Sequence, residues 1–110
     1  MSLNYECERA MKLTIPSVRI AVAKMLKKEH EWSETDIAKA LGVAQPAVSK
    51  YMTGNYAPEL NVIVDRIISD GLHAQIVGMI LKKAGTERVN ALIDKVSSDK
   101  RLLDLALHKQ

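Results

Sequence analysis

The stretch of sequence that decides the fold is residues 34–54, which read ETDIAKALGVAQPAVSKYMTG. Two short helices that cross through a tight turn need a small residue at the crossing and a turn residue that accepts positive φ. Ala38 and Gly42 meet these requirements at the correct spacing. Apolar residues follow in the same register, to plug the corner or face inward: Ile37, Leu41, Val43, Val48 and Tyr51. The stretch therefore predicts two packed helices, the second over residues 45–52.

The ends of these two helices also carry local signals. Ser33 and Asp36 have the spacing of a capping box, which predicts the start of the first helix at Ser33. Gly54 and Asn55 end the second helix, and Pro58 lies in the loop that follows.

This stretch resembles the Cro/cI-repressor-like (XRE-type) helix-turn-helix family through the phrase IAxxLGVxQxAVSxY, residues 37–51. Cys7-Glu8 and Ile15-Pro16-x-x-Arg19 extend the resemblance to about residues 7–57. With these flanks the chain looks like a group of predicted archaeal transcriptional regulators, some of which carry a thiamine-phosphate-synthase-like domain. We expect 110 residues to be too few for such an enzyme, and residues 59–110 resemble no family.

The resemblance implies that the second helix lies in the major groove of double-stranded DNA, with its N-terminal residues at base edges. Its outward-facing residues are Gln45, Pro46, Ser49, Lys50 and Thr53. We expect Gln45 to pair bidentately with adenine N6 and N7. Ser49 then faces a base or a phosphate, and Lys50 a guanine or a phosphate. Pro46 is placed to contact a thymine methyl group.

Two further residues are expected to contact the DNA backbone. Thr35 and the N–H groups at the start of the first helix face a phosphate, and Asn55 meets the backbone further along. The sequence departs from the family at two positions. Glu34 stands where the family often has a glutamine that braces the backbone or the other glutamine, and its carboxylate repels phosphate. Ala44 replaces a capping Ser or Thr, which forgoes roughly 1 kcal/mol.

The composition favours an all-α protein. Hydrophobic residues make up 47% of the chain, yet it has no Phe and only four aromatic residues. The net charge is +3, and basic and acidic residues are spread evenly along the chain. This charge permits a polyanionic partner without requiring one.

We expect a lambda-repressor-like head of four to five helices over residues 1–58, followed by a helical tail over residues 59–110. A short helix is expected near residues 4–12. A second helix should begin at Thr14-Ile15-Pro16, because proline is tolerated in a first turn, and end near residues 29–32. Amphipathic patterns in the tail lie around residues 60–68, 76–81, 89–96 and 102–107, with Thr86 as a candidate cap.

Other signals argue against catalysis. Cys7 is the only cysteine, the three histidines are scattered, and no phosphate-binding glycine-rich loop or nucleophile motif is present. We therefore predict no enzyme, no cofactor and no metal. The sequence has neither a signal-peptide pattern nor a long apolar run, so we expect a cytoplasmic protein that does not associate with a membrane.

These observations favour a sequence-specific transcriptional regulator, most simply a dimeric repressor. Such proteins gain specificity by reading two half-sites. The tail is the expected homodimer interface, because its aliphatic residues exceed what short amphipathic helices can bury alone. The alternative is a protein-interaction module, for instance an antitoxin-like partner binder that uses the tail. The tail is also a possible site for an effector or protein partner, although no residue identifies one.

Overall fold

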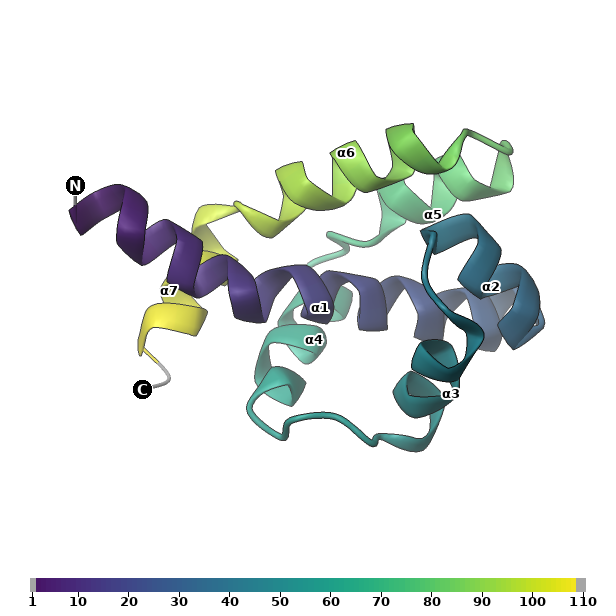
Figure 1. The fold of residues 1–110 in the computed structure, drawn as a ribbon, viewed down its shortest axis with the longest axis horizontal. Coiled ribbons are helices and arrows are strands. Elements are labelled where there is room, and N and C mark those ends of the chain that lie inside the picture. The colour runs from purple at the N-terminus through teal and green to yellow at the C-terminus, as the bar shows by residue number, and fades with distance from the viewer. Residues whose placement is uncertain (1, 109–110) are drawn as a thin grey trace.

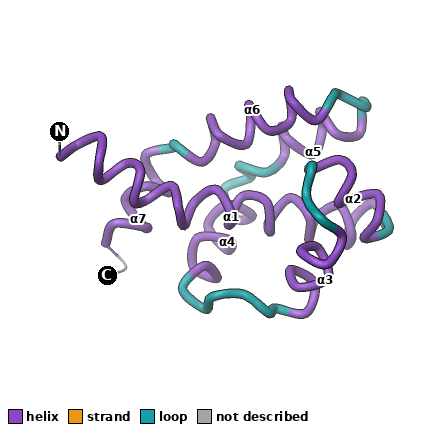
Figure 2. Tube along the Cα trace, viewed as in Figure 1, coloured by secondary structure: helices purple, strands orange, loops and turns teal. Residues whose placement is uncertain are grey.

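The computed structural model describes residues 2–108, with side chains for residues 6–107. Within this range every regular element is an α-helix, which confirms the all-α expectation. Its elements are α1 (Ser2–His30), α2 (Glu34–Leu41), α3 (Gln45–Thr53), α4 (Leu60–Ser69), α5 (Ala74–Leu81), α6 (Thr86–Ser97) and α7 (Lys100–His108). Figure 2 shows that only short loops separate them.

Helix α1 differs from the sequence expectation. It is one continuous helix of 29 residues with Pro16 inside it, so the expected second start at residues 14–16 is wrong. A proline inside a helix removes one backbone hydrogen bond and costs about 3 kcal/mol. The residues that follow it, Val18 and the run 20–23, are fully buried, so tertiary packing outweighs this local cost. The described part of the expected head, residues 2–58, consequently holds three helices instead of four or five.

All the later helices pack around α1, which lies through the middle of the molecule (Figure 1). Helices α2 and α3 lie at its C-terminal end, and α6 runs along one side. The buried apolar residues of the head and the tail form one cluster, which joins Leu26 and Ile37 to Ile63, Ile76 and Ile93. The predicted segments 1–58 and 59–110 therefore share one hydrophobic core.

The tail uses its aliphatic residues within the chain. The described residues include only two large apolar side chains that are clearly exposed, Val62 at 41% and Leu81 at 40%. The premise that the tail helices cannot bury their aliphatic residues is therefore wrong, because α1 covers them. The homodimer itself stays a prediction that needs other support.

The caps of the tail differ in one place from the sequence interpretation. Gly85, rather than Thr86, precedes α6 as its N-cap residue. The Thr86 hydroxyl instead donates to the Lys39 carbonyl oxygen of α2 at 3.4 Å. In the part of the chain that the structure describes, no helix is both long and apolar enough to cross a membrane.

Candidate nucleic-acid interface

The turn between α2 and α3 is built around Gly42. Its φ of 72° lies in the left-handed region, and its N–H donates to the Ala38 carbonyl oxygen at 2.9 Å. The N–H of Val43 donates to the same oxygen at 3.0 Å. A Cβ atom at Gly42 would lie 2.7 Å from Thr86 Cγ2 of α6. The turn thus needs glycine both for its φ and for the close approach of α6.

The interior of the corner confirms the pattern expected from the sequence. Its buried side chains are Ile37, Ala38, Leu41 and Val48, while Val43 and Tyr51 are half-buried against the same core. Burial raises the pKa of Tyr51, and the nearby positive charge of Arg19 offsets part of that rise.

The two helices of the corner start differently. Ser33 caps α2, as expected, because its Oγ accepts the N–H of Asp36 at 3.1 Å. Ala44 has the extended backbone of an N-cap residue, with φ −73° and ψ 146°, but no side-chain group to accept a hydrogen bond. Pro46 occupies the first turn of α3, where its missing N–H is tolerated.

One outer face of α3 collects the residues expected to meet DNA. Four of them are exposed (Gln45, Pro46, Lys50, Thr53) and Ser49 is half-buried. Thr35 is exposed at the second position of α2, and Asn55 is exposed just after α3. The Asn55 N–H donates to the Lys50 carbonyl oxygen at 2.9 Å, which holds the loop against the end of α3. All seven positions expected to contact DNA are therefore at least partly open to solvent, on α3, at the start of α2 and just after α3.

Three side chains of this surface are bonded to one another. Gln45 Nε2 donates to Glu34 Oε1 at 3.1 Å and to Ser49 Oγ at 3.1 Å. The Ser49 hydroxyl donates to the same Glu34 oxygen at 2.6 Å. Glu34 therefore braces Gln45, as a glutamine is expected to do in the resembled family. Glu34, Gln45 and Ser49 together form the Glu34 triad.

Thr53 lies at the C-terminal end of the outer face of α3. Its hydroxyl donates to the Ser49 carbonyl oxygen at 3.2 Å or to that of Lys50 at 3.3 Å. The hydroxyl hydrogen is thus directed back to the helix, which leaves the oxygen lone pairs toward solvent.

Helix α6 holds the end of α2 through contacts that the sequence analysis missed. Asn90 Nδ2 donates to the Leu41 carbonyl oxygen at 3.1 Å, which satisfies an acceptor at the C-terminus of α2. Arg19 of α1 donates to Asn90 Oδ1 at 3.3 Å. A local sequence pattern gives no signal for this link, because its three residues lie far apart in the chain.

The loop after α3 is tethered by Tyr56. Lys24 Nζ donates to the Tyr56 hydroxyl at 2.8 Å and lies 5.3 Å from the ring centroid, and the hydroxyl donates to Asn61 Oδ1 at 3.0 Å. Lys24 therefore fastens this loop to α1 and is not directed away from the protein.

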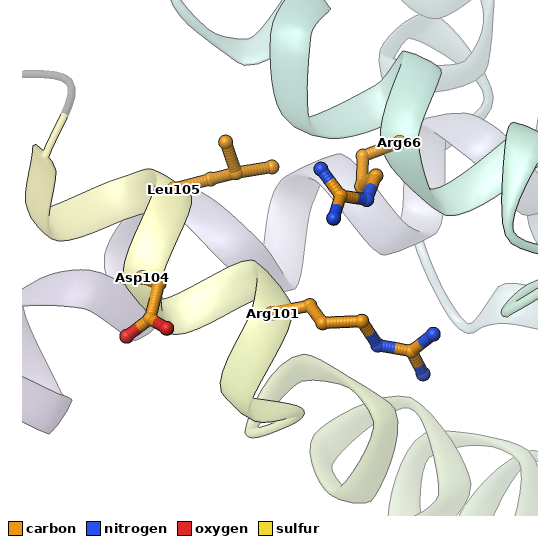
Figure 3. A pocket seen from close by; sticks show the side chains of 4 residues that line it. All are labelled: Arg66, Arg101, Asp104 and Leu105. Atoms are coloured by element: carbon orange, nitrogen blue, oxygen red, sulfur yellow. The ribbon is translucent and has the colours of Figure 1, made fainter.

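A shallow depression lies on the tail, between α4 and α7 (Figure 3). Arg66, Arg101, Asp104 and Leu105 line it. Its two guanidinium groups are already paired, since Arg66 and Arg101 reach Asp70 at 2.9 and 3.3 Å. Arg101 also pairs with Asp99 at 3.0 Å, and this hydrogen bond lowers the pKa of that carboxyl group. The depression therefore offers an effector no unpaired guanidinium group, and its remaining charged group is the carboxylate of Asp104.

Comparison with known proteins supports the class of this corner. Residues 22–65 match the family model described as Helix-turn-helix. The match runs from α1 through α2 and α3 into α4, and it supports a DNA-binding helix-turn-helix regulator. Together with the all-helical architecture it fits a lambda-repressor-like fold. Closeness to archaeal regulators and a fused thiamine-phosphate-synthase-like domain draw no support from it. No curated protein and no solved structure matches the chain.

Proposed function

We propose that this protein is a sequence-specific regulator of transcription that places α3 in the major groove of double-stranded DNA. The observation that carries the proposal is the solvent-facing surface of α3, whose polar side chains are exposed yet held in place. Gln45 and Ser49 are fixed by the Glu34 triad at the N-terminal end of α3, where this class of helix approaches base edges. Held side chains lose less conformational freedom on binding, which favours discrimination between bases.

The remaining residues of the surface suit contacts with the DNA backbone. Lys50 is exposed on α3, Thr35 is exposed at the second position of α2, and Asn55 is exposed just after α3. The N-terminus of α2 adds backbone N–H groups that can donate to a phosphate beside Thr35, but the Asp36 N–H is not among them because it donates to Ser33 Oγ. We assign backbone contacts to Thr35 and Asn55, and either a phosphate or a guanine to Lys50.

We further propose that the protein binds as a homodimer and acts as a repressor. One α3 helix spans only a few base pairs, and two copies on half-sites about 34 Å apart would supply the missing affinity. The apolar residues of the tail are mostly buried within the chain and leave no broad apolar face for this dimer among the described residues, so the geometry of DNA alone favours it. Sedimentation of the protein with and without a selected duplex tests it, and a single copy per duplex would contradict it.

A charge reversal on α3 tests DNA binding most simply. Lys50→Glu should abolish measurable affinity for duplex DNA, because it replaces an attraction to phosphate with a repulsion. Lys12→Glu is the matched control: Lys12 is exposed on the N-terminal half of α1, at the other end of the molecule (Figure 1). It should bind as the wild type does. Fluorescence anisotropy at several salt concentrations gives the binding constant, whose logarithm should fall linearly with the logarithm of the salt concentration.

The alternative function, a partner-binding module that uses the tail, makes the opposite prediction. Lys50→Glu would then change nothing, and substitutions on α4 to α7 would matter. The tail exposes little large apolar surface among the described residues, which weighs against a broad apolar docking site there. An effector that acts through the tail would reach α3 through the contact of α6 with the turn at Gly42.

A further inference from the structure

The Glu34 triad uses up its hydrogen-bond donors internally. A glutamine amide carries two N–H donors, and Gln45 turns its nitrogen inward, so that Nε2 donates to Glu34 Oε1 and to Ser49 Oγ, both at 3.1 Å. A serine hydroxyl carries one hydrogen, and Ser49 directs it at Glu34 Oε1, at 2.6 Å. The groups left over for a ligand are the Gln45 carbonyl oxygen, one lone pair on Ser49 Oγ and Glu34 Oε2, since the hydrogen bonds within the triad use only Oε1 of that carboxylate. All three are acceptors.

Glu34 imposes this direction on the other two residues. An ionised carboxylate accepts hydrogen bonds and donates none, so the Gln45 amide has to turn its nitrogen toward Glu34 and its oxygen toward solvent. Hydrogen bonds to a charged acceptor are shorter and about twice as strong as neutral ones. Glu34 is also the first residue of α2, where the helix dipole favours a negative charge. The arrangement is therefore costly to reverse when α3 meets a ligand.

Bases differ in what they offer to an acceptor in the major groove. Cytosine presents the N4 amine there and adenine the N6 amine, whereas guanine and thymine present only acceptors and a methyl group. A bidentate contact with adenine needs a glutamine donor for N7 in addition to an acceptor for N6. In the triad that donor is already engaged with Glu34 and Ser49.

We propose, resting on the DNA-binding function above, that Glu34 is the residue that sets the base preference of α3. By fixing Gln45 and Ser49 as acceptors, it selects a base that carries an exocyclic amine, cytosine or adenine, and rejects guanine and thymine. The Gln45–adenine contact is then a single hydrogen bond to N6. This replaces the bidentate contact that the sequence alone predicts. Lys50 becomes the side chain of this face that donates to guanine or to phosphate.

A selection from a randomised duplex pool tests the proposal, and Gln45→Ala first identifies the base position that Gln45 reads. At that position the wild type should accept adenine and cytosine with similar affinity. Glu34→Gln frees the amide to turn, so the variant should favour adenine over cytosine about fivefold or more, the effect of gaining one bidentate pair worth ~1–3 kcal/mol. In a Gln45→Ala background, Glu34→Gln should leave the base preference unchanged.

Asp36→Asn is the matched control, because Asp36 is exposed in the same turn of α2 and only its backbone N–H takes part in the cap. It removes the same charge and should keep the wild-type preference, while both variants gain affinity for DNA of any sequence. A duplex with 7-deazaadenine at the selected position lacks N7. It should weaken binding of Glu34→Gln and leave that of the wild type unchanged.

The triad can also be observed without DNA. In the free protein the Gln45 side-chain amide protons should be protected and shifted in nuclear magnetic resonance spectra, and both effects should disappear in Glu34→Ala. A wild type that prefers adenine strongly and needs its N7 would overturn the proposal, as would a Glu34→Gln variant with unchanged preference. If neither protein binds any duplex even at low salt, the DNA-binding function fails first, and the base preference fails with it.

Discussion

The corner formed by α2 and α3 and the tail formed by α4 to α7 are held in different ways. The corner is fixed by local stereochemistry, namely a cap at Ser33 and left-handed glycines at Gly42 and Gly54. The tail is fixed by burial of aliphatic side chains against α1, such as Ile63 and Ile93. The corner keeps polar groups in ordered positions at the surface. The tail contributes many of the buried apolar residues in the core that supports the corner.

The tail and the corner are joined by shared contacts despite this difference. Helix α1 belongs to both regions, and α6 touches the turn of the corner through Thr86 and Asn90. The surface that meets a ligand and the helices that support it are thus parts of one body.

The largest expected effect comes from the shared core. Ile63→Ala in α4 and Ile37→Ala in α2 each remove a fully buried side chain. Each should lower the free energy of unfolding by about 2–5 kcal/mol. Urea unfolding checks this with two probes: far-UV circular dichroism follows all helices, and fluorescence of Trp32, the only tryptophan, follows the region before α2.

In both variants the two probes should give one transition with the same midpoint. If Ile63→Ala leaves the Trp32 transition at the wild-type midpoint while the helical signal falls earlier, the two regions are separate domains. The shared core would then be contradicted.

The turn glycines give the next largest effect. Gly42→Ala and Gly54→Ala both place an alanine at positive φ, which costs about 1–2 kcal/mol. Only at Gly42 does the new Cβ also meet Thr86 Cγ2, at 2.7 Å, whereas at Gly54 the space is open. Gly42→Ala should therefore lower the free energy of unfolding by about 1 kcal/mol or more beyond the loss in Gly54→Ala, because overpacking typically costs that much.

The double variant Gly42→Ala with Thr86→Ser isolates the contact between α6 and the turn. Serine lacks Cγ2, so the double variant should recover the additional loss but not the loss due to φ. Equal costs for Gly42→Ala and Gly54→Ala in chemical denaturation would show that α6 does not press on the turn.

The smallest effect concerns the helix caps. Ala44→Ser gives α3 a hydroxyl that can accept from the Ala47 N–H in addition to the Ala44 carbonyl oxygen, which now accepts it at 3.0 Å, and the backbone already has the extended conformation of a cap. It should stabilise the protein by about 0.5–1 kcal/mol, and Ser33→Ala should destabilise it by about the same amount. Thermal unfolding of the two variants measures both changes in stability. A destabilising Ala44→Ser would mean that the hydroxyl is not accommodated at the start of α3.

The corner and the rest of the molecule also differ in how well the sequence predicts them. The corner is predictable because each of its residues has a local requirement, as Gly42 does for positive φ and Ser33 for a cap. The continuity of α1 across Pro16 is not, because it depends on burial against helices that come later in the chain. The link from Arg19 through Asn90 to Leu41 is not predictable for the same reason.

The candidate site shows a similar division. The sequence identifies the exposed residues of α3, including Gln45 and Lys50, from helical periodicity. It also marks Glu34 as a departure from the resembled family. It does not reveal that one carboxylate oxygen accepts from both Gln45 and Ser49, because that requires the relative placement of two helices.

The most direct test of the central claim is a titration of ¹⁵N-labelled protein with a short duplex that the wild type has selected, followed residue by residue. If α3 reads the major groove, the largest changes in chemical shift should fall on residues 33–36, 44–50 and 53–56. The signals of α4 to α7 should keep nearly the chemical shifts of the free protein. Shifts concentrated on the tail would contradict the account, as would a spectrum that does not change at low salt.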